Sequence, residues 1–465
     1  MPPISPRFST TFTGSAATSP SPETTATTRE LARVLRLPDV ILIVVGTVIG
    51  SGIFLVPGGV LRDSGGDVGV ALLVWIVGGV LSLLGALTYA ELGAMNPQAG
   101  GLYVYLRDAF GPLPAFLYGW ALFFVIGSGS IATLAAAFPR YVQQFVVLDA
   151  LGTKLVSLAT IVVVTAVNVR GTRHGAVVQN WSTGIKVAAL LLLSALLLLE
   201  GKGLTGPNVR VLATPPSAEL LSGAAVAIVA VLWAYEGWQY VTFSAGEIVE
   251  PQRIFARGIV VGTIAIVAIY LFANLAYLAA LGPDRVTQSN RVAADAATTL
   301  FGETWGRLVA IPILVSIFGA ANGIALTAPR VFYAMARDGL FFRRLAEVHP
   351  RFGTPAVAIL AGGAWTMVLA GSGTFEQLLT YVVFTGWAFY ALAAASIFVY
   401  RRRLPHAARP FRVPGYPLTP LFFIAASAGI VVSTLVSRPT QALLGLGIIF
   451  LGMPAYWWWR RSTSS

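Results

Sequence analysis

The sequence predicts an all-α integral membrane protein with twelve transmembrane helices. Of its 465 residues, 56% are hydrophobic and 11% are charged, whereas about a quarter of the residues of a soluble domain carry charge. Apolar runs of about 20 residues recur along the chain, and a helix of that length crosses roughly 30 Å of hydrocarbon. The strands of an outer-membrane barrel would instead alternate in polarity over about ten residues, so the spans are predicted to be helices.

Twelve apolar segments are long enough to cross the membrane. They cover residues 37–57, 68–92, 113–140, 151–169, 175–199, 219–246, 257–281, 305–336, 355–371, 376–399, 417–436 and 439–458. Residues 1–28 are rich in Ser, Thr and Pro and contain no apolar stretch, so we expect a disordered tail and not a signal peptide. Residues 286–301 are too polar to cross and are expected to form a short helix at the outer interface.

The basic residues predict how the chain lies in the membrane. An even number of spans places both termini on one side, and most of the 31 lysines and arginines then fall in segments on that side. Cytoplasmic loops are rich in Lys and Arg, so we predict a multi-pass protein of the inner or plasma membrane with both termini in the cytoplasm. The clusters Arg343–Arg344 and Arg401–Arg403 would then be topology signals that contact lipid headgroups. The net charge of +12 needs no nucleic-acid partner.

Residue types that carry chemistry are scarce. Cysteine is absent, which excludes disulfides, thiolate metal sites and a disulfide-linked accessory subunit. The histidines, His174, His349 and His406, fall in predicted cytoplasmic loops, so no histidine relay or metal site is expected at membrane depth. We therefore predict no enzyme, no catalytic residues, no metal and no other cofactor.

Two predicted helices are interrupted near the middle of the membrane. The first span reads GTVIGSGIF over residues 46–54, and the sixth reads LWAYEGWQY over residues 232–240. Glycine in a helix interior costs roughly 1 kcal/mol relative to alanine, so these segments predict a loss of helix. Unpaired backbone groups are tolerated at that depth only beside a cavity enclosed by protein. As an alternative, Gly46 and Gly50 form a GxxxG pattern that would suit helix packing.

Paired breaks at corresponding positions of two halves are typical of an inverted-repeat transporter. The half-helix after a break offers free N–H groups and a positive dipole end, which suit a carboxylate. The carbonyls that precede the break suit an ammonium group, so the pattern favours binding of an α-amino acid. A channel would need polar groups along a continuous pore, whereas here they cluster at one level.

Seven longer sequence motifs are distributed along most of the chain. They are GTVIGSGIF at 46–54, YAELGAMNPQAGGLYVYL at 89–106, FGPLPAFLYGW at 110–120, VQNWSTGIK at 178–186, LWAYEGWQY at 232–240, GEIVEPQR at 246–253 and PRVFYAMARDGLFFRRLAEVHPRFGTP at 329–355. In these motifs the chain resembles the amino acid, polyamine and organocation transporter superfamily, and within it the L-type amino acid transporter group. The resemblance implies a five-plus-five inverted repeat with discontinuous helices 1 and 6, two extra C-terminal helices, and alternating access.

That architecture divides the chain into three regions. Residues 1–28 would be the tail, residues 29–416 the ten-helix core, and residues 417–465 helices eleven and twelve with a short cytoplasmic C-terminus. Within the core, the first repeat would cover about 37–199 and the second about 219–399.

The resemblance also implies a substrate site at the two breaks. The residues that would bind the substrate carboxylate are Thr47, Gly50, Ser51 and Gly52, and the main-chain carbonyls that would bind its ammonium group belong to Val48, Trp233 and Glu236. Trp233 would also close over the substrate as an outer gate. As an alternative, its ring is ordinary core packing.

Lys186 and Glu236 are the ionisable residues predicted to matter for coupling. Lys186 lies roughly 16 Å into the fifth span, where an ammonium group needs partners or loses its proton. In related transporters a lysine here replaces a sodium ion. The resemblance thus implies that Lys186 holds the first span through carbonyls such as that of Gly46, and through Asn322 or its neighbours. The alternatives are a proton-coupled or conformation-coupling role and a purely structural cation.

Glu236 departs from most neutral-substrate relatives, which have a small residue at this position. A carboxylate near the midplane costs a few kcal/mol unless it is paired or protonated. Three interpretations are open: it pairs with a cationic substrate side chain, it carries a coupled proton, or it caps a helix in neutral form. Glu247, at the inner end of span six, is expected to be solvated rather than part of a gate salt bridge with Arg33 or Arg36.

We therefore predict a secondary active amino acid transporter, either an exchanger or a proton-coupled carrier, with a cationic substrate favoured. The alternatives are a neutral amino acid or polyamine permease, and an amino acid sensor that does not transport. The expected partners are a small amino acid and membrane lipid. Trp387 and Ser128 would either line the side-chain pocket or pack in the core.

Overall fold

The computed structural model describes residues 31–206, 209–372, 375–437 and 439–463, so the predicted tail lies outside the described residues. Within these ranges the regular elements are helices, and an isolated β-bridge joins Leu35 to Ile248. Eleven helical stretches in the described chain are long and apolar enough to cross a membrane. A further apolar helix of 17 residues, Ala356–Ser372, lies where the ninth span was predicted.

The elements follow the predicted spans, with several spans divided into shorter pieces. In chain order they are α1 (Leu37–Val48), α2 (Gly52–Leu55), α3 (Pro57–Asp63), α4 (Val68–Met95), α5 (Leu102–Phe110), α6 (Pro112–Ala121), η1 (Leu122–Ile126), α7 (Gly127–Val142), α8 (Ala150–Val169), α9 (Thr172–Glu200), η2 (Gly203–Thr205), α10 (Ala218–Ala234), η3 (Trp238–Glu247), α11 (Pro251–Leu281), α12 (Pro283–Gln288), α13 (Val292–Phe301), α14 (Glu303–Thr327), α15 (Pro329–Arg337), η4 (Arg343–Ala346), α16 (Ala356–Ser372), α17 (Phe375–Arg403), α18 (Leu418–Ser437) and α19 (Pro439–Thr463).

The first and sixth spans are both interrupted, as the sequence predicted. Helix α1 ends at Val48 and α2 begins at Gly52, while α10 ends at Ala234 and the 3₁₀ helix η3 begins at Trp238. Gly237, in the second break, has φ +133°, a conformation that other residues rarely adopt. A Cβ atom on Gly237 would lie 2.8 Å from the carbonyl carbon of Thr47. Glycine therefore allows the two breaks to touch.

The third span contains an irregularity that the sequence analysis did not predict. Between α6 and α7, residues 122–126 form a π-helical turn, η1. Such turns insert one residue into the helical register and occur often at functional sites. On α7, which follows this turn, Ser130 and Leu134 lie one turn apart and both line a cavity inside the protein. The predicted interfacial helix at 286–301 is likewise divided, into α12 and α13.

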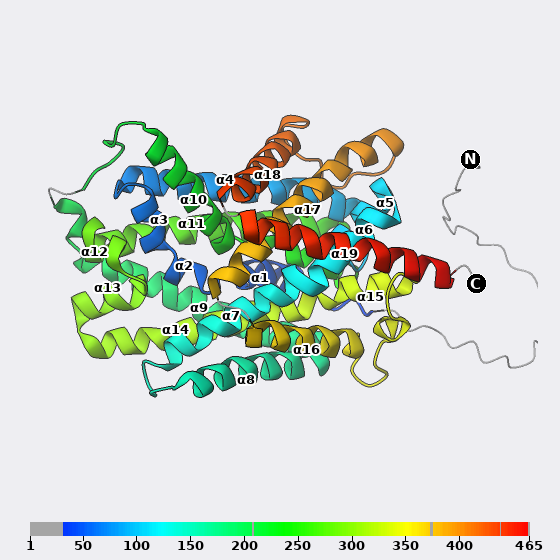
Figure 1. The fold of residues 1–465 in the computed structure, drawn as a ribbon, viewed down its shortest axis with the longest axis horizontal. Helices are drawn as coiled ribbons and strands as arrows, with labels where there is room; N and C mark the ends of the chain where they lie inside the picture. The colour runs from blue at the N-terminus through cyan, green and yellow to red at the C-terminus, as the bar shows by residue number, and fades with distance from the viewer. Residues whose placement is uncertain (1–30, 207–208, 373–374, 438, 464–465) are drawn as a thin grey trace, which may run out of the picture.

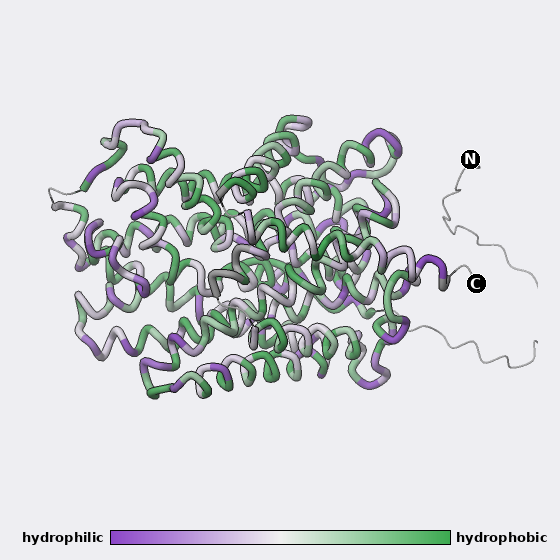
Figure 2. Tube along the Cα trace, in the orientation of Figure 1, coloured by the Kyte–Doolittle hydropathy of each residue, from purple (hydrophilic) through white to green (hydrophobic). Residues whose placement is uncertain are grey.

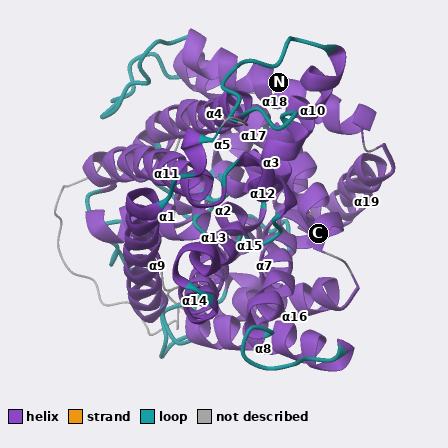
Figure 3. Ribbon diagram, turned by 90° about the vertical axis from the view of Figure 1, so that its left-hand side faces the viewer, coloured by secondary structure: helices purple, strands orange, loops and turns teal. Residues whose placement is uncertain are grey.

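Long helices run side by side along the longest axis of the molecule (Figure 1). Helices α12 and α13 lie at the left end of that view and α5 and α15 towards the right end. Most hydrophilic residues gather at the two ends of the molecule, and hydrophobic residues fill the region between them (Figure 2). Viewed along the axis, α1 and α2 lie near the centre and α8, α18 and α19 at the periphery (Figure 3). The interrupted first span is therefore enclosed by protein, as its unpaired backbone requires.

Candidate functional site

A small cavity of about 20 Å³ lies where the two helix breaks meet. Its lining residues are Thr47, Val48, Gly50, Ser51, Gly52, Ser130, Leu134, Trp233, Glu236 and Ile324. Every residue that was predicted to bind substrate is in this set, together with three apolar or hydroxyl side chains from α7 and α14. The volume is enough for about one water molecule, so the cavity must widen before a metabolite can bind.

The first break supplies polar groups to the cavity. The hydroxyl oxygen of Ser51 is buried and has no hydrogen-bond partner among the described residues. Helix α2 begins at the next residue, so its first N–H groups have no acceptor within the helix. A buried hydroxyl without a partner costs about 1–3 kcal/mol, and an acceptor placed in the cavity would remove that cost. An anionic oxygen fits this position.

Tyr270 of α11 joins the two breaks. Its hydroxyl lies 3.1 Å from the carbonyl oxygen of Val48 and 3.0 Å from that of Ala234. A phenol has one proton to donate, so it can satisfy only one of these carbonyls at a time. The carbonyl of Val48, which was predicted to bind an ammonium group, therefore has capacity for a second donor. No local pattern in the sequence points to Tyr270, because it lies in a different span from both breaks.

Lys186 of α9 reaches the first break from the other side. Its ammonium nitrogen lies 2.6 Å from the carbonyl oxygens of Gly46 and Ile49, and 3.3 Å from that of Ser316. The side chain is buried, with 1% of its surface exposed. The predicted contact between Lys186 and the Gly46 carbonyl is present in the structure. Two backbone carbonyls at the break and one of α14 thus surround the Lys186 nitrogen.

Asn322 is not brought to Lys186. Its side-chain amide donates hydrogen bonds to the carbonyl oxygen of Gly175 at 3.1 Å and to Gln179 at 3.0 Å, and its oxygen accepts one from Asn168 at 2.9 Å. These partners belong to α8 and α9, so Asn322 joins neighbouring helices in a buried polar cluster. Its neighbour on α14 that reaches the break is Ser316, whose hydroxyl donates to Ile49 or Gly50 at 3.0–3.1 Å.

Glu236 lies at the second break with 8% of its surface exposed. One carboxylate oxygen, Oε1, accepts hydrogen bonds from Gln239 and from the hydroxyl of Tyr390, both at 2.5 Å. Among the described residues, neither Lys nor Arg lies within ion-pair distance of this carboxylate, and its second oxygen accepts no hydrogen bond. The arrangement holds the carboxylate in place with neutral donors and leaves one oxygen available to a ligand in the cavity.

Glu247 departs from its prediction. It is buried rather than solvated, and its carboxylate forms an ion pair with Arg330 of α15 at 2.7 Å. The hydroxyl of Thr172 donates to the same carboxylate at 2.8 Å, and we call these three residues the Glu247 latch. The prediction was wrong because it weighed only Arg33 and Arg36, at the inner end of the first span, as partners. Arg330, 83 residues away, fell inside the predicted eighth span and was not considered.

The cavity is closed towards both ends of the molecule. Towards α12, a Cβ atom on Gly58 of α3 would lie 2.3 Å from the carbonyl oxygen of Ser289, so the backbones touch there. Towards the opposite end, the main-chain oxygen of Glu247 accepts hydrogen bonds from the N–H groups of Val34 and Leu35 at 2.8 and 2.9 Å. The latch and these backbone bonds together tie the chain before α1, η3, α9 and α15 to one another.

Two other predicted residues lie away from this cavity. Trp387 is buried against Phe423 and Tyr390 and is not among the lining residues. Ser128 lines a separate small cavity between α7, α8, α14 and α16. Arg401, expected to contact lipid headgroups, instead forms an ion pair at 2.6 Å with Glu91, which is fully buried.

Known proteins of similar sequence cover nearly the whole chain. Residues 35–453 match the amino acid permease family. The chain is 33% identical over 438 residues to the serine/threonine exchanger SteT of Bacillus subtilis (strain 168), and the aligned region covers 94% of this chain and 98% of that protein. It is 32% identical over 443 residues to the cystine/glutamate transporter of Homo sapiens, which covers 92% of this chain and 85% of that protein. It is 33% identical over 441 residues to the b(0,+)-type amino acid transporter 1 of Homo sapiens, with coverages of 92% and 86%.

These matches confirm the resemblance that the sequence motifs indicated. They are transport proteins, which agrees with an apolar, many-helix chain. The chain therefore belongs to the amino acid permease family of the amino acid, polyamine and organocation superfamily, a family of multi-pass membrane transporters and not of enzymes.

Proposed function

We propose that this protein exchanges α-amino acids across the cytoplasmic membrane by alternating access, and that its preferred substrates have a cationic side chain. A relative named as an exchanger aligns with most of the chain, which supports exchange. The observation that carries the substrate preference is Glu236. Its carboxylate lines the same cavity as Ser51 and has no cationic partner within ion-pair distance in the described part of the chain.

The two ends of an amino acid would bind at the two sides of the cavity. Its carboxylate would accept hydrogen bonds from the Ser51 hydroxyl and the N–H groups at the start of α2, beside Thr47, Gly50 and Gly52. Its ammonium group would donate to the main-chain carbonyls of Val48, Trp233 and Glu236. The ring of Trp233, 6% exposed and part of the lining, would close the cavity towards α12 and α13. A cationic side chain would then reach the Glu236 carboxylate.

Lys186 would couple binding to the movement of the first span. It holds the carbonyls of Gly46 and Ile49 on one side of the break, while the substrate would hold Ser51 and Gly52 on the other. A change at the break would therefore change the contacts of Lys186. A buried ammonium needs these acceptors to remain charged, and this is why the residue suits a place that a metal cation could otherwise fill.

The interrupted helices support a five-plus-five inverted repeat. The first repeat would cover about 37–199 and the second about 219–399, inside a core at 29–416, with α18 and α19 as additional helices at 417–465. We place the termini, α5 and α15 on the cytoplasmic side because basic residues are concentrated there. A chain without cysteine would work without a disulfide-linked accessory subunit.

A second candidate function is proton-coupled uptake. The hydrogen bonds of Glu236 to Tyr390 and Gln239 would also hold a carboxyl group that gains and loses a proton during the cycle. In that case the substrate would be a neutral amino acid or a polyamine. A sensor that binds and does not transport would have the same cavity.

Counterflow in proteoliposomes tests the proposal. Vesicles loaded with unlabelled arginine should accumulate labelled arginine or lysine above equilibrium, at the same rate at pH 6 and pH 8. The variant Glu236→Gln should lose at least tenfold in kcat/KM for arginine (~1.4 kcal/mol), with a much smaller loss for neutral amino acids, because only a cationic side chain needs the charge.

Controls separate the alternatives. Glu236→Asp keeps the charge and should retain most of the activity with arginine, while Glu219→Gln, at an exposed position of the same span, should change nothing. Counterflow of neutral amino acids alone would support the neutral carrier, and uptake that rises with an inward proton gradient would support proton coupling. Binding without counterflow of any amino acid or polyamine would leave the sensor and refute the proposal.

A further inference from the structure

A second cavity, of about 450 Å³, opens at the end of the molecule that carries α5 and α15 (Figure 1). It lies between the end of η3, the loop before α5, the C-terminal part of α15 and the segment before α1. The polar side chains that line it are Arg33, Gln98, Arg107, Tyr333, Arg337 and Asp338. We call it the arginine vestibule. Its volume is in the range of small-molecule sites.

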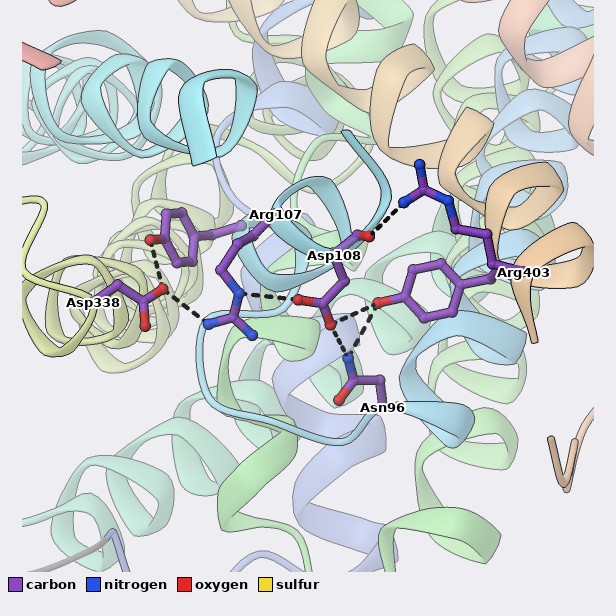
Figure 4. A network of polar contacts seen from close by, with 7 residues as sticks. Asn96, Arg107, Asp108, Asp338 and Arg403 are labelled. Atoms are coloured by element: carbon purple, nitrogen blue, oxygen red, sulfur yellow. Dashed lines mark hydrogen bonds and ion pairs between the residues drawn. The ribbon is translucent and has the colours of Figure 1, made fainter. Parts of the chain in front are cut away.

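The vestibule has more positive than negative charge. Arg107 is neutralised, because its guanidinium pairs with Asp338 at 2.8 Å and with Asp108 at 2.9 Å (Figure 4). Arg33 and Arg337 have no carboxylate within 4.0 Å among the described residues; the guanidinium of Arg337 lies over the ring of Tyr333 instead, at 5.8 Å from its centroid. Among the residues that the structure describes, these two guanidinium groups therefore have no paired carboxylate.

With Asp108 included, two carboxylates stand against three arginines here, so one positive charge is in excess. Asp338 already accepts hydrogen bonds from Arg107 and, at 2.8 Å, from the hydroxyl of Tyr103. Asp108 is engaged by Arg107 on one oxygen and by Asn96 and Tyr400 on the other, at 2.8 and 3.1 Å (Figure 4). In the described part of the chain, both carboxylates thus pair with groups other than Arg33 and Arg337.

The position of the vestibule links it to the substrate path. Gly246, one of its lining residues, directly precedes Glu247 of the latch. From Gly237, which touches Thr47 in the substrate cavity, η3 descends roughly 20 Å to that point at about 2 Å per residue. Along the α14–α15 stretch, Arg330 of the latch falls between Ile324, which lines the substrate cavity, and Tyr333, which lines the vestibule. Opening the latch would therefore join the two cavities.

We propose that the arginine vestibule binds the carboxylate group of amino acids on the face predicted to be cytoplasmic, before the latch opens. This inference rests on the proposed amino acid transport. A guanidinium binds a carboxylate through two parallel hydrogen bonds, and a concave surface of one charge raises the local concentration of counter-ions. Because the excess charge repels cations, this face favours acidic and zwitterionic amino acids over cationic ones. The two faces of the transporter then differ in preference.

Charged thiol reagents measure this potential directly, because the natural chain has no cysteine. The variant Ala99→Cys places one thiol in the vestibule. The control, Ala407→Cys, places one in a neighbouring cavity of about 730 Å³ whose lining contains one Arg and one Asp, Arg403 and Asp108. Both alanines are half-buried. We expect the ratio of the labelling rate of anionic to that of cationic methanethiosulfonate to be about tenfold higher at residue 99.

The double variant Arg33→Gln/Arg337→Gln should bring that ratio down to the control value and remove its dependence on salt. Glutamate and acetate, added at the same ionic strength, should slow labelling at residue 99 and not at residue 407. In counterflow, the double variant should raise the KM for neutral amino acids on this face several-fold while kcat and the KM on the other face stay unchanged, which also shows that the variant folds.

Equal reagent ratios at the two positions, or labelling that carboxylates do not slow, would overturn the inference. Inorganic phosphate that protects residue 99 where glutamate does not would assign the vestibule to free phosphate and would also overturn it. Failure of the proposed function is a separate outcome: the parent chain would then show no counterflow at all, whatever the charge ratio at residue 99.

Discussion

Asp67 shows how much a single residue contributes to the end of the molecule near α12. Its fully buried carboxylate caps α4 through the N–H groups of Gly69 and Val70. It also accepts hydrogen bonds of 2.8–3.0 Å from the loop between α9 and α10, at Leu212 and Thr214 among others. One carboxylate thus joins the start of α4 to the loop between α9 and α10.

These bonds make stability depend on pH. Burial raises the pKa of Asp67, but the hydrogen bonds from Thr214, Leu212 and Val70 outweigh it and lower the pKa from 3.8 to about 2. A lowered folded-state pKa stabilises the protein above the unfolded value, and the contribution disappears as the pH falls through the folded value. Its size is about 2 kcal/mol.

We therefore expect Asp67→Asn to lower the stability of the detergent-solubilised protein by about 2 kcal/mol at pH 7, with the deficit shrinking below pH ~4. Thermal unfolding of parent and variant between pH 7 and pH 3 measures this. Asp149→Asn is the matched control, because Asp149 caps α8 at an exposed position and should cost only about 0.5 kcal/mol. A deficit for Asp67→Asn that is constant over this range would contradict the explanation.

Some residues of the site could be predicted from the sequence and others could not, and the difference is how far along the chain their partners lie. Thr47, Ser51 and Glu236 could be predicted because each belongs to a glycine-interrupted segment, a pattern visible within ten residues. Tyr390, which holds Glu236, lies 154 residues away in the sequence, and Tyr270 lies 222 residues from Val48. An aromatic residue in an apolar span looks the same whether it packs against lipid or donates a hydrogen bond at the site, so nothing in the sequence distinguishes these two.

At the scale of the elements, the Glu247 latch joins parts that must separate for the cavity to open. Its ion pair is almost fully buried, with 0% and 1% of the two side chains exposed. Removing one partner of a buried pair leaves an uncompensated charge and costs about 3–5 kcal/mol, whereas replacing both is often close to neutral. The latch can therefore hold η3 against α15 without adding much to the overall stability.

A double-mutant cycle checks this. Arg330→Met alone should destabilise the protein by about 3–5 kcal/mol, and Arg330→Met with Glu247→Gln should recover most of that loss. The exposed pair Arg253 and Glu250, whose charged atoms lie 3.7 Å apart, is the control and should show a coupling of at most about 1 kcal/mol. Coupling energies of the same size for both pairs would mean that the latch is an ordinary surface contact.

The sequence could predict those elements that have a local sequence pattern. Apolar length identified the spans and glycine identified both breaks, because each is a local property of the chain. The π-helical turn η1 leaves no such signal: the residues LFFVI would suit an α-helix equally well, and only packing in the folded protein selects the wider turn. The division of 286–301 into α12 and α13 is similar. At this division Ser289 contacts Gly58, and the two residues lie far apart in the sequence, so no local pattern shows the contact.

At the scale of the whole molecule, the structure is closed at both ends at once. Gly58 meets α12 on one side, the Glu247 latch lies on the other, and the cavity between them holds about 20 Å³. Alternating access requires that opening one end favours closure of the other, because both movements pass through the same two breaks. A channel would allow both ends to open independently.

A thiol in the cavity distinguishes these cases. Ser130 lines the cavity and is buried, so Ser130→Cys in the cysteine-free chain should react slowly with membrane-impermeant reagents from either face. Adding Gly58→Leu places a side chain where a Cβ atom would already lie 2.3 Å from Ser289, and should increase labelling from the α12 face at least fivefold while decreasing it from the α5 face. Adding Glu247→Gln with Arg330→Met should do the reverse.

Val147→Cys, at a position 97% exposed, reports the orientation of the vesicles and should be unaffected by either change. If both perturbations raised labelling from both faces, the two ends would be uncoupled and the exchange mechanism would be wrong.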